Sequence, residues 1–194
     1  MTRIAESVMK NFAKLFQTKQ ARRTRPTQSR CASGSAEILE VREVPTTFVV
    51  NAAYDITRVD NDTTLREAVA QANANPGADT IVFAPGLAGR QIELSRDRGY
   101  GVLQVTGDLT VIGIPDNPNT RGDERITISG GGTNDRAGTQ IFAVDDGNVS
   151  RDINVVFSNF NMTRGWNRAL PGGAVVNNEN LTVNGVNFYD NASF

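Results

Sequence analysis

The sequence after residue 78 is a succession of short apolar segments, almost all of which are bounded by Gly, Asn or Asp. Short apolar runs between turn-forming residues are typical of β-strands. Two of the segments, Leu109–Ile114 and Leu181–Val186, are identical at four of six positions. A third segment with a similar profile begins at Ile153, and the 28 residues from there to Leu181 lie within the period range of stacking repeats. We predict strands at 48–51, 80–83, 91–94, 102–105, 109–114, 126–130, 140–144, 153–163, 173–178 and 181–189.

Strands this short cannot bury an apolar face alone. They can do so when successive coils stack at about 4.8 Å, because the inward Ile, Val, Leu and Phe side chains then form columns. Asn and Gly suit the corners of such coils, since both tolerate left-handed backbone conformations. The pattern therefore predicts an all-β solenoid, whose end exposes unpaired strand edges and has to be covered.

A short amphipathic helix precedes most of these strands and is the expected cover. Thr64 and Glu67 have the spacing of a capping box. Leu65, Ala68, Val69 and Ala72 then form a narrow face of small and apolar residues, and Asn75-Pro76-Gly77 ends the helix. We expect Arg66 and Glu67 to serve the cap and the surface, and not a reaction.

Residues 63–94, TTLREAVAQANANPGADTIVFAPGLAGRQIEL, resemble the C-S-L-R-E-A-I-x-x-A-N segment that precedes right-handed parallel β-helix repeats in bacterial surface proteins. Residues 171–193, PGGAVVNNENLTVNGVNFYDNAS, resemble one coil of the same family. Thr63-Thr64 replaces the family's Cys-Ser, which keeps the capping hydroxyl and loses the cysteine. The resemblance implies a right-handed parallel β-helix with a short N-terminal capping helix. The coils between residues 85 and 145 are irregular, and we expect loop insertions there, above all at 113–125.

The first part of the chain differs in composition from the rest. Every lysine lies at or before position 19, and residues 1–30 carry a net charge of +7 against −8 for the remainder. We therefore predict a basic leader and linker at 1–45 and a β-helix domain at 46–194. Within that domain, the cap strand and helix occupy 46–77 and the coils 78–194. The apolar residues of 3–16 recur at helical spacing but are too few to span a bilayer, so no transmembrane segment is expected.

Three interpretations of the leader are open: a nucleic-acid-binding tail, a solvated tail, and an export signal. The basic run has no interleaved aromatic residues and precedes an acidic body, which disfavours nucleic acid. Residues 39–51, LEVREVPTTFVVN, resemble the LE-x-R-x-VP-x-TF-x-V junction that follows a basic leader in many large bacterial surface proteins. This resemblance implies an extracellular or cell-surface location.

The composition excludes several kinds of catalytic centre. The sequence has no histidine, which removes Ser-His and Cys-His pairs and every His-ligated metal site. Cys31 is the only cysteine and can form no disulfide within the chain.

Two acidic clusters could bind a hard cation. Asp55, Asp60 and Asp62 are candidate calcium ligands, because Ca²⁺ prefers several carboxylate and carbonyl oxygens. They lack the EF-hand spacing, and a solvated loop at the helix N-terminus is the favoured alternative. For Asp145-Asp146-Gly147 we favour a turn over a second oxygen site. Calcium is the only cofactor that these residues suggest.

Candidate ligand-binding residues gather in the segment TRGWNRALPGG. Trp166, Arg164 and Arg168 lie there together, and the tryptophan could stack on a sugar or cover the edge of a coil. Arg151 and Asp152 are further candidates for a lyase, although arginine is a poor base without an unusual environment. Arg121-Gly122-Asp123 matches a cell-binding tripeptide, but three-residue matches occur often by chance and an exposed turn explains it fully.

The sequence therefore predicts a secreted or surface-displayed β-helix that serves as a scaffold or adhesin-like protein with a possible carbohydrate ligand. A polysaccharide lyase or glycoside hydrolase with its cleft along one sheet face is the alternative. Three or more carboxylates on one face would favour the enzyme, and ladders of Asn, Thr and Ser would favour the scaffold. The last segment ends where the family would begin another coil, so we also expect the remaining coils of a longer chain.

Overall fold

The computed structural model describes residues 44–95, 101–131, 138–168 and 171–193. The chain divides into two units, Met1–Glu40 and Val41–Phe194, and all described residues belong to the second. The leader and linker predicted at 1–45 therefore fall almost entirely outside the described residues, as does Cys31.

The described residues are mostly β-strands, with one α-helix and one short 3-10 helix. Nearly every predicted strand is present within a few residues of its expected bounds. The elements in chain order are β1 (Thr47–Val50), α2 (Leu65–Ala74), β2 (Asp79–Phe83), η1 (Pro85–Leu87), β3 (Gln91–Glu93), β4 (Leu103–Val105), β5 (Leu109–Ile112), β6 (Thr127–Ser129), β7 (Phe142–Val144), β8 (Asn154–Ser158), β9 (Asn161–Thr163), β10 (Trp166–Asn167), β11 (Val175–Asn177), β12 (Asn180–Asn184), β13 (Asn187–Tyr189) and β14 (Ala192–Ser193).

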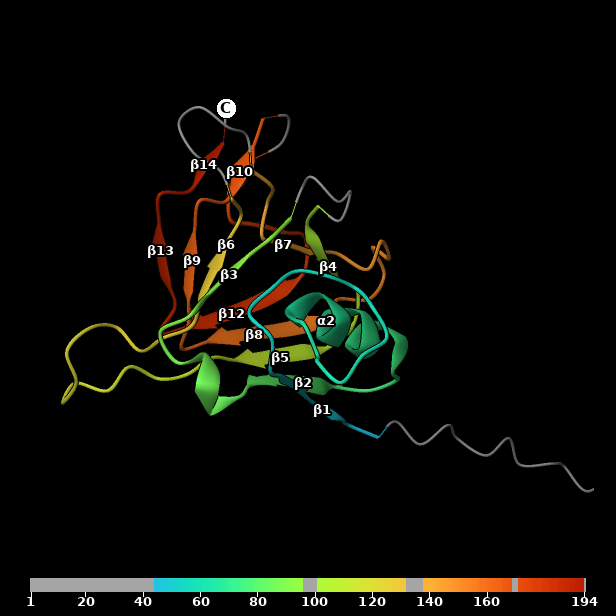
Figure 1. Cartoon of the computed structure of the whole chain (residues 1–194). Helices are drawn as coiled ribbons and strands as arrows, with labels where there is room; N and C mark the ends of the chain where they lie inside the picture. Colours follow the sequence, from blue (N-terminus) through green and yellow to red (C-terminus); the bar gives the residue numbers. More distant parts are fainter. Residues whose placement is uncertain (1–43, 96–100, 132–137, 169–170, 194) are drawn as a thin grey trace, which may run out of the picture. The chain divides into compact units, whose positions relative to one another are not determined.

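All strand pairs of the described residues are parallel. The five-stranded sheet has the order β1-β2-β5-β8-β12, the four-stranded sheet β13-β9-β6-β3, and the three-stranded sheet β11-β7-β4. A two-stranded sheet joins β10 to β14. The chain visits the five-, four- and three-stranded sheets in the same order three times, as β2-β3-β4, β5-β6-β7 and β8-β9-β11, and each passage adds one strand to each sheet (Figure 1). We call the strands added in one passage a layer; β12, β13 and β14 begin the next one.

The core lies between these sheets and consists of columns of inward side chains. Residues that are register partners in successive strands are buried together. Phe157 of β8 links two sheets, because its ring lies 4.6 Å from that of Phe142 and 5.7 Å from that of Phe160, measured between centroids. The main buried columns are Ile81, Val111 and Phe157 in the five-stranded sheet, Ile92, Ile128 and Met162 in the four-stranded sheet, and Leu103 and Phe142 in the three-stranded sheet.

Helix α2 begins and ends as the sequence predicts. The hydroxyl of Thr64 accepts a hydrogen bond from the Glu67 N–H, and a Glu67 carboxylate oxygen accepts from the Thr64 N–H at 2.9 Å. Asn75 terminates the helix in an extended conformation. The buried face is the predicted one, and the helix packs against β1, β2 and β4. Because β1 and β4 are the first strands of their sheets, α2 covers the core at the end where the first layer lies (Figure 1).

The expectation that Arg66 serves the surface is wrong. Its Nε donates to Asp55 Oδ1 at 2.7 Å and its Nη2 to Asp55 Oδ2 at 2.9 Å, and the side chains are 13% and 1% exposed. The same Nη2 donates to the carbonyl of Gly101 at 2.8 Å. Arg66 therefore fastens α2 to the preceding loop and to the start of the segment that forms β4.

Two predicted strands are each a pair of strands on different sheets. The segment 153–163 forms β8 and β9, and 181–189 forms β12 and β13. The corners that separate them have positive φ, 59° at Asn159 and 62° at Gly185. These angles fall in the left-handed region, which asparagine and glycine tolerate.

The repeat period between the last two layers is 26 residues and not 28. Val155, and not Ile153, is the register partner of Leu181, and Asn154 pairs with Asn180 at a separation of 26. Leu109 also pairs with Val155, so the two similar segments found in the sequence occupy equivalent positions. Both segments contain a glycine at the fifth position. In the first segment this is Gly113, where only glycine fits, because a Cβ would lie 2.2 Å from the Asn159 carbonyl oxygen.

The insertion expected at 113–125 is present. Residues 113–126 connect β5 to β6, whereas Asn159 and Phe160 alone connect β8 to β9 one layer later. The inserted loop is held by its own polar contacts: Arg125 lies 3.5 Å from Asp116 and 3.3 Å from Asp123.

Candidate functional site

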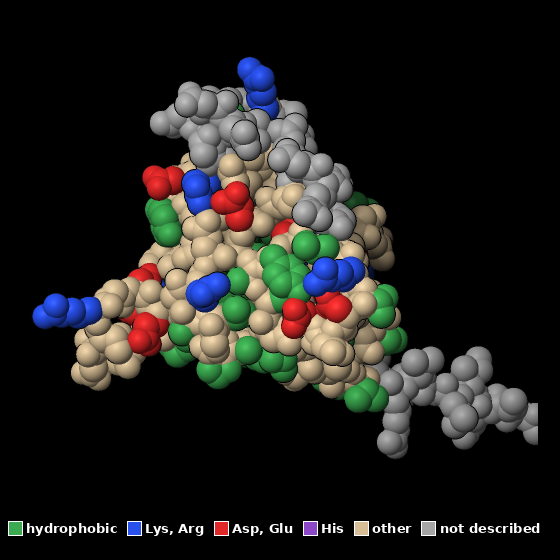
Figure 2. Space-filling view, in the orientation of Figure 1, with side chains coloured by type: hydrophobic (Ala, Val, Ile, Leu, Met, Phe, Trp, Pro, Cys, Tyr) green, Lys and Arg blue, Asp and Glu red, His purple; other side chains and the backbone are tan. Residues whose placement is uncertain are grey.

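The outward face of the five-stranded sheet is regular and uncharged. Along one row, Thr47, Thr80, Thr110, Val156 and Thr182 are successive register partners. A second row consists of Val49, Val82, Ile112, Ser158 and Asn184. The lower margin of the molecule in Figure 2, where β1 and β2 lie in Figure 1, is accordingly hydrophobic and uncharged polar surface. Hydroxyl, amide and methyl groups are what this face can offer to a ligand.

The outward positions of the four-stranded sheet are polar. One row is Gln91, Thr127, Asn161 and Asn187, and the other is Glu93, Ser129, Thr163 and Tyr189. Asn161 is buried although it faces outward, because the inserted loop crosses it and Asp123 Oδ2 accepts a hydrogen bond from its Nδ2 at 2.8 Å. This contact also engages the aspartate of Arg121-Gly122-Asp123, so that tripeptide does not present a free carboxylate.

An acidic corner lies where the three-stranded sheet leads back to the five-stranded sheet. One carboxylate oxygen from each of Asp145, Asp146 and Glu179 lies within 4.8 Å of the other two. Asp145 Oδ1 accepts from the Gly147 N–H at 2.7 Å, which forms the turn favoured from the sequence. The Asn178 side chain donates to Asp145 Oδ2 at 2.9 Å. This hydrogen bond, followed by that of Gly147, lowers the pKa of Asp145 in spite of some desolvation.

The other two carboxylates of this corner also accept hydrogen bonds from backbone N–H groups. Glu179 accepts from the Asp146 N–H at 3.2 Å and from the Ile153 N–H at 3.0 Å, and Asp146 accepts from the Asn148 N–H at 2.7 Å. These bonds join the end of β7, the start of β8 and the start of β12. Three carboxylates are suitable ligands for a hard cation. Each of them also accepts backbone hydrogen bonds that stabilise the local fold.

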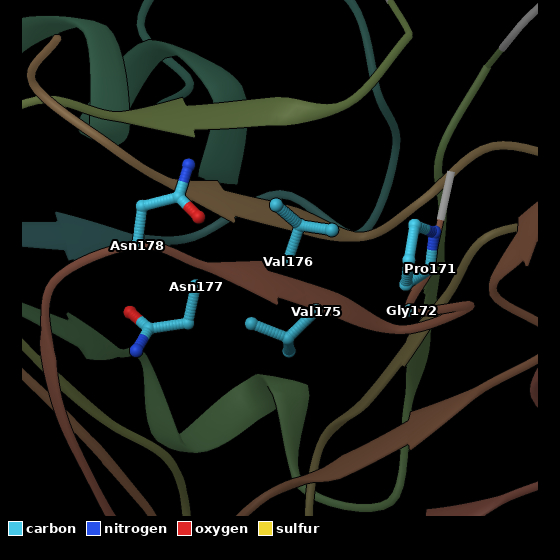
Figure 3. Close-up of a pocket in the computed structure, with 6 residues that line it drawn as sticks. All are labelled: Pro171, Gly172, Val175, Val176, Asn177 and Asn178. Atoms are coloured by element: carbon cyan, nitrogen blue, oxygen red, sulfur yellow. The ribbon is translucent and has the colours of Figure 1, made fainter. Parts of the chain in front are cut away.

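A pocket of about 380 Å³ runs along the free edge of β11, next to the acidic corner. In Figure 3, Val176 and Asn178 point to one side of the strand and Val175 and Asn177 to the other. The pocket thus follows the edge of the strand and not one of its faces. Its lining residues are Pro171, Gly172, Val175, Val176, Asn177 and Asn178.

The structure divides the three candidate calcium ligands among different partners. Asp55 is buried against Arg66, and its Oδ2 also accepts from the Ser95 N–H at 2.7 Å. Asp60 pairs with Arg58, which lowers the pKa of the aspartate, and Asp62 accepts from the Tyr54 hydroxyl at 2.5 Å. The three carboxylates do not form a common group of the kind found at the acidic corner.

The candidate ligand-binding residues lie at the corner after β9. Arg164 has a φ of 53° and its Nη2 is 3.3 Å from Glu93 Oε2 across two layers. Trp166 is partly buried, begins β10 and pairs with Ala192 of the next layer. Arg168, Arg151 and Asp152 are exposed.

Glu179 is the residue of the acidic corner that the sequence did not suggest. It lies 33 positions after Asp146, and no local motif connects the two. The two residues are close only because successive layers pair. The correct repeat register would have been needed to predict their contact from the sequence.

Within the described ranges, no helix has the length and apolar character needed to cross a membrane. Comparison of the chain with protein-family models, with curated proteins and with solved structures finds no match.

Proposed function

We propose that residues 46–194 form a right-handed parallel β-helix. Two features support this. The chain returns to three parallel sheets in a constant order, and register partners from successive layers are buried as columns. Stacked coils of this kind bury a continuous core that no layer could bury alone. The right-handed sense of the proposed β-helix is inferred from the resemblance of residues 63–94 and 171–193 to the surface-protein family.

We further propose that the protein is secreted or displayed on the cell surface and works as a scaffold with an adhesin-like binding face. The outward positions of the two largest sheets carry this proposal. In the described residues the five-stranded sheet holds one row of four threonines and Val156, and a second row of three aliphatic residues, Ser158 and Asn184. The two rows of the four-stranded sheet are polar, with Glu93 as their single charged side chain, but Ser129, Asn161 and Thr163 in them are buried. Such a face can bind a carbohydrate through hydroxyl and amide groups, whereas acid–base catalysis requires several ionisable groups that converge on one bond.

The alternative is a lyase or hydrolase. A glycosidase needs two carboxyl groups about 5 to 9.5 Å apart that flank the substrate. The carboxylates of the acidic corner are close together, but each accepts hydrogen bonds that fix the turn after β7 or the start of β8. Arg151 and Asp152 are in the same connection and are the nearest candidates in sequence for an enzymatic role.

A glycan array and a lyase assay on acidic polysaccharides, both with the full chain, test this proposal. The expected result is binding to a defined glycan without formation of unsaturated or shortened products. The variant Thr110→Lys places a long charged side chain in the middle of the threonine row and should abolish binding. Thr106→Lys makes the same substitution at an exposed position after β4, outside the five-stranded sheet; it is the matched control and should bind normally. Product formation that Glu179→Gln abolishes would establish the enzyme instead, and the absence of both binding and product would overturn the adhesin-like function.

A further inference from the structure

Five asparagines of the sequence begin an Asn-x-Ser/Thr motif, and the structure separates one of them from the other four. The motif marks asparagines that can carry an N-linked glycan when they lie in a surface loop of an exported chain. Asparagine is also a frequent turn residue, so the motif alone selects no site in a chain with this many turns. The five residues are Asn61, Asn148, Asn161, Asn180 and Asn191.

Three of these side chains hold the fold together. Asn161 is 4% exposed, and its Nδ2 donates to a carboxylate of the inserted loop. The Nδ2 of Asn180 donates to the side chain of Asn154 in the neighbouring strand at 3.4 Å. Asn191 makes two hydrogen bonds to the backbone of the preceding layer, at 2.8 Å through Oδ1 and at 3.0 Å through Nδ2. A glycan on any of these three nitrogens would break a contact between layers or with the inserted loop.

Asn148 lies in a loop that is longer than its counterparts in the other layers. Residues 145–153 connect β7 to β8, whereas 106–108 form the equivalent corner one layer earlier and 178–179 the one that follows. Amides from both ends of the long loop donate to one carboxylate of the acidic corner, at 3.2 and 3.0 Å, which fixes its base. The tip is exposed, and Val149 in the middle of the motif is 102% exposed. The acidic corner thus holds an accessible motif in place.

The side chain of Asn148 forms an Asx turn within its own motif. Its Oδ1 accepts from the Ser150 N–H at 3.1 Å, and its backbone carbonyl accepts from the Arg151 N–H at 3.2 Å. Because an N–H donates to the side chain, the bonded atom is the oxygen, and Nδ2 is the other branch of the amide. Within the described part of the chain, neither this Nδ2 nor the Ser150 hydroxyl forms a hydrogen bond. The acceptor nitrogen and the hydroxyl of the motif are both accessible.

Asn61 is the other motif with an exposed asparagine, but its surroundings differ. Thr63, the third residue of that motif, is partly buried, and its N–H donates to Asn51 Oδ1 at 2.7 Å. This N–H therefore does not close an Asx turn on Asn61. The next residue is Thr64, which is buried and caps α2. Binding of this segment by an enzyme would have to disturb the helix cap.

We propose that Asn148 is an N-glycosylation site whose donor is a glycosyl diphosphate carried on a lipid. Transfer forms a bond between Asn148 Nδ2 and C1 of the sugar and breaks the bond from C1 to the phosphate oxygen. The lipid diphosphate leaves with that electron pair, and one Nδ2 proton passes to a base of the transferase. The proposal rests on the proposed function in one respect, the export of the chain. The glycan would lie at the corner after β7, away from the outward face of the five-stranded sheet.

Transfer to the folded full chain by a purified, motif-specific oligosaccharyltransferase with its lipid-linked oligosaccharide tests the site without requiring export. Mass spectrometry of tryptic peptides gives the position, because peptide 137–151 contains Asn148 as its only motif and peptide 59–66 contains Asn61. We expect the mass of the transferred glycan on 137–151 and little or none on the other motifs. Absence of transfer to 137–151 overturns the proposal, and so does transfer to it only after the chain is unfolded.

Two variants separate recognition of the motif from a change in the turn. Ser150→Ala removes the hydroxyl and keeps the backbone N–H that bonds Asn148, so it should abolish transfer while circular dichroism stays unchanged. Ser150→Thr restores a hydroxyl and is the matched control that should accept the glycan. Equal transfer to Ser150→Ala and the unaltered chain overturns the proposal. A glycan array with the unmodified chain tests the adhesin-like function separately. Modification of Asn148 without binding on the array would overturn that function alone, and binding without modification would overturn this site alone.

Discussion

The ion pair between Arg66 and Asp55 allows a direct test of how the cap is attached. Asp55 is 1% exposed, and both of its oxygens accept hydrogen bonds from the Arg66 guanidinium. Replacing Arg66 by methionine keeps most of the side-chain volume but leaves a buried carboxylate without its counter-charge. Removing one partner of a buried pair typically costs about 3–5 kcal/mol. We therefore expect Arg66→Met to lower the free energy of unfolding by about that amount.

The chain contains a matched pair at the surface. Arg58 lies against Asp60, with side chains 60% and 25% exposed. Exposed pairs contribute about 0–1 kcal/mol. Arg58→Met should therefore change the free energy of unfolding far less than Arg66→Met. Both substitutions remove a guanidinium from an Arg–Asp pair, so burial is the main difference between them.

Urea unfolding, followed by far-ultraviolet circular dichroism, gives both free energies. The double variant Asp55→Asn with Arg66→Met removes the unpaired charge and should recover part of the stability lost in the single variant. Equal and small effects of Arg66→Met and Arg58→Met would refute the reasoning, because the buried carboxylate would then not depend on Arg66. Failure of the double variant to recover any stability would show that the bonds of Arg66 to carbonyl groups matter more than the charge.

Three further predictions concern the cap, a corner and the acidic turn. Thr64→Ala should cost about 1 kcal/mol of unfolding free energy in urea titrations, because the helix loses its N-cap acceptor. Gly113→Ala should cost about 1–3 kcal/mol or more in the same assay, since its Cβ would meet the Asn159 carbonyl oxygen at 2.2 Å. The pKa of Asp145 is lower in the folded chain than the ordinary aspartate pKa of about 3.9. The ionised carboxylate therefore stabilises the fold fully when the pH is above that ordinary pKa, and this stabilisation is lost as the pH falls through the lowered pKa. Asn178→Ala should reduce this dependence in an acid titration of the thermal midpoint.

Each of these has a control within the chain. Thr64→Ser keeps the capping hydroxyl and should be nearly neutral. Gly86→Ala meets no atom within 4 Å and should change stability far less than Gly113→Ala. In Asp145→Asn the ionisable group is absent, so this variant should lose more of the acid dependence than Asn178→Ala, in which the Gly147 N–H still lowers the pKa of Asp145. Unchanged acid dependence in both variants would contradict a role of Asp145.

The sequence predicted those features that depend on local patterns. The α2 cap required only Thr64, Glu67 and the Asn-Pro-Gly stop, and all three act as expected. Most strands were found because turn-forming residues separate them. The two segments that were taken as single strands contain sharp corners at Asn159 and Gly185, which change the sheet without interrupting the apolar pattern.

Contacts between layers could not be predicted in the same way. They depend on the register, and an error of two residues in the period was enough to separate Val155 from Leu181. For the same reason Glu179 was not connected with Asp145. The ion pair of Arg66 with Asp55 also depends on how the loop before α2 folds back, because eleven positions separate the two residues.

The positions of the charged residues lead to a last prediction about the proposed ligand. Arg66 and Asp55 attach the cap, and the acidic corner fixes the start of β8 and β12. The outward face of the five-stranded sheet carries no charge in the described strands. Binding at that face should therefore depend on hydroxyl, amide and methyl contacts, which salt does not screen. Affinity for a glycan found by the array should change little between low and high salt, and Ser158→Ala should weaken it. A steep loss of affinity with salt would place the binding site elsewhere, at charged residues such as Arg164 or Arg168.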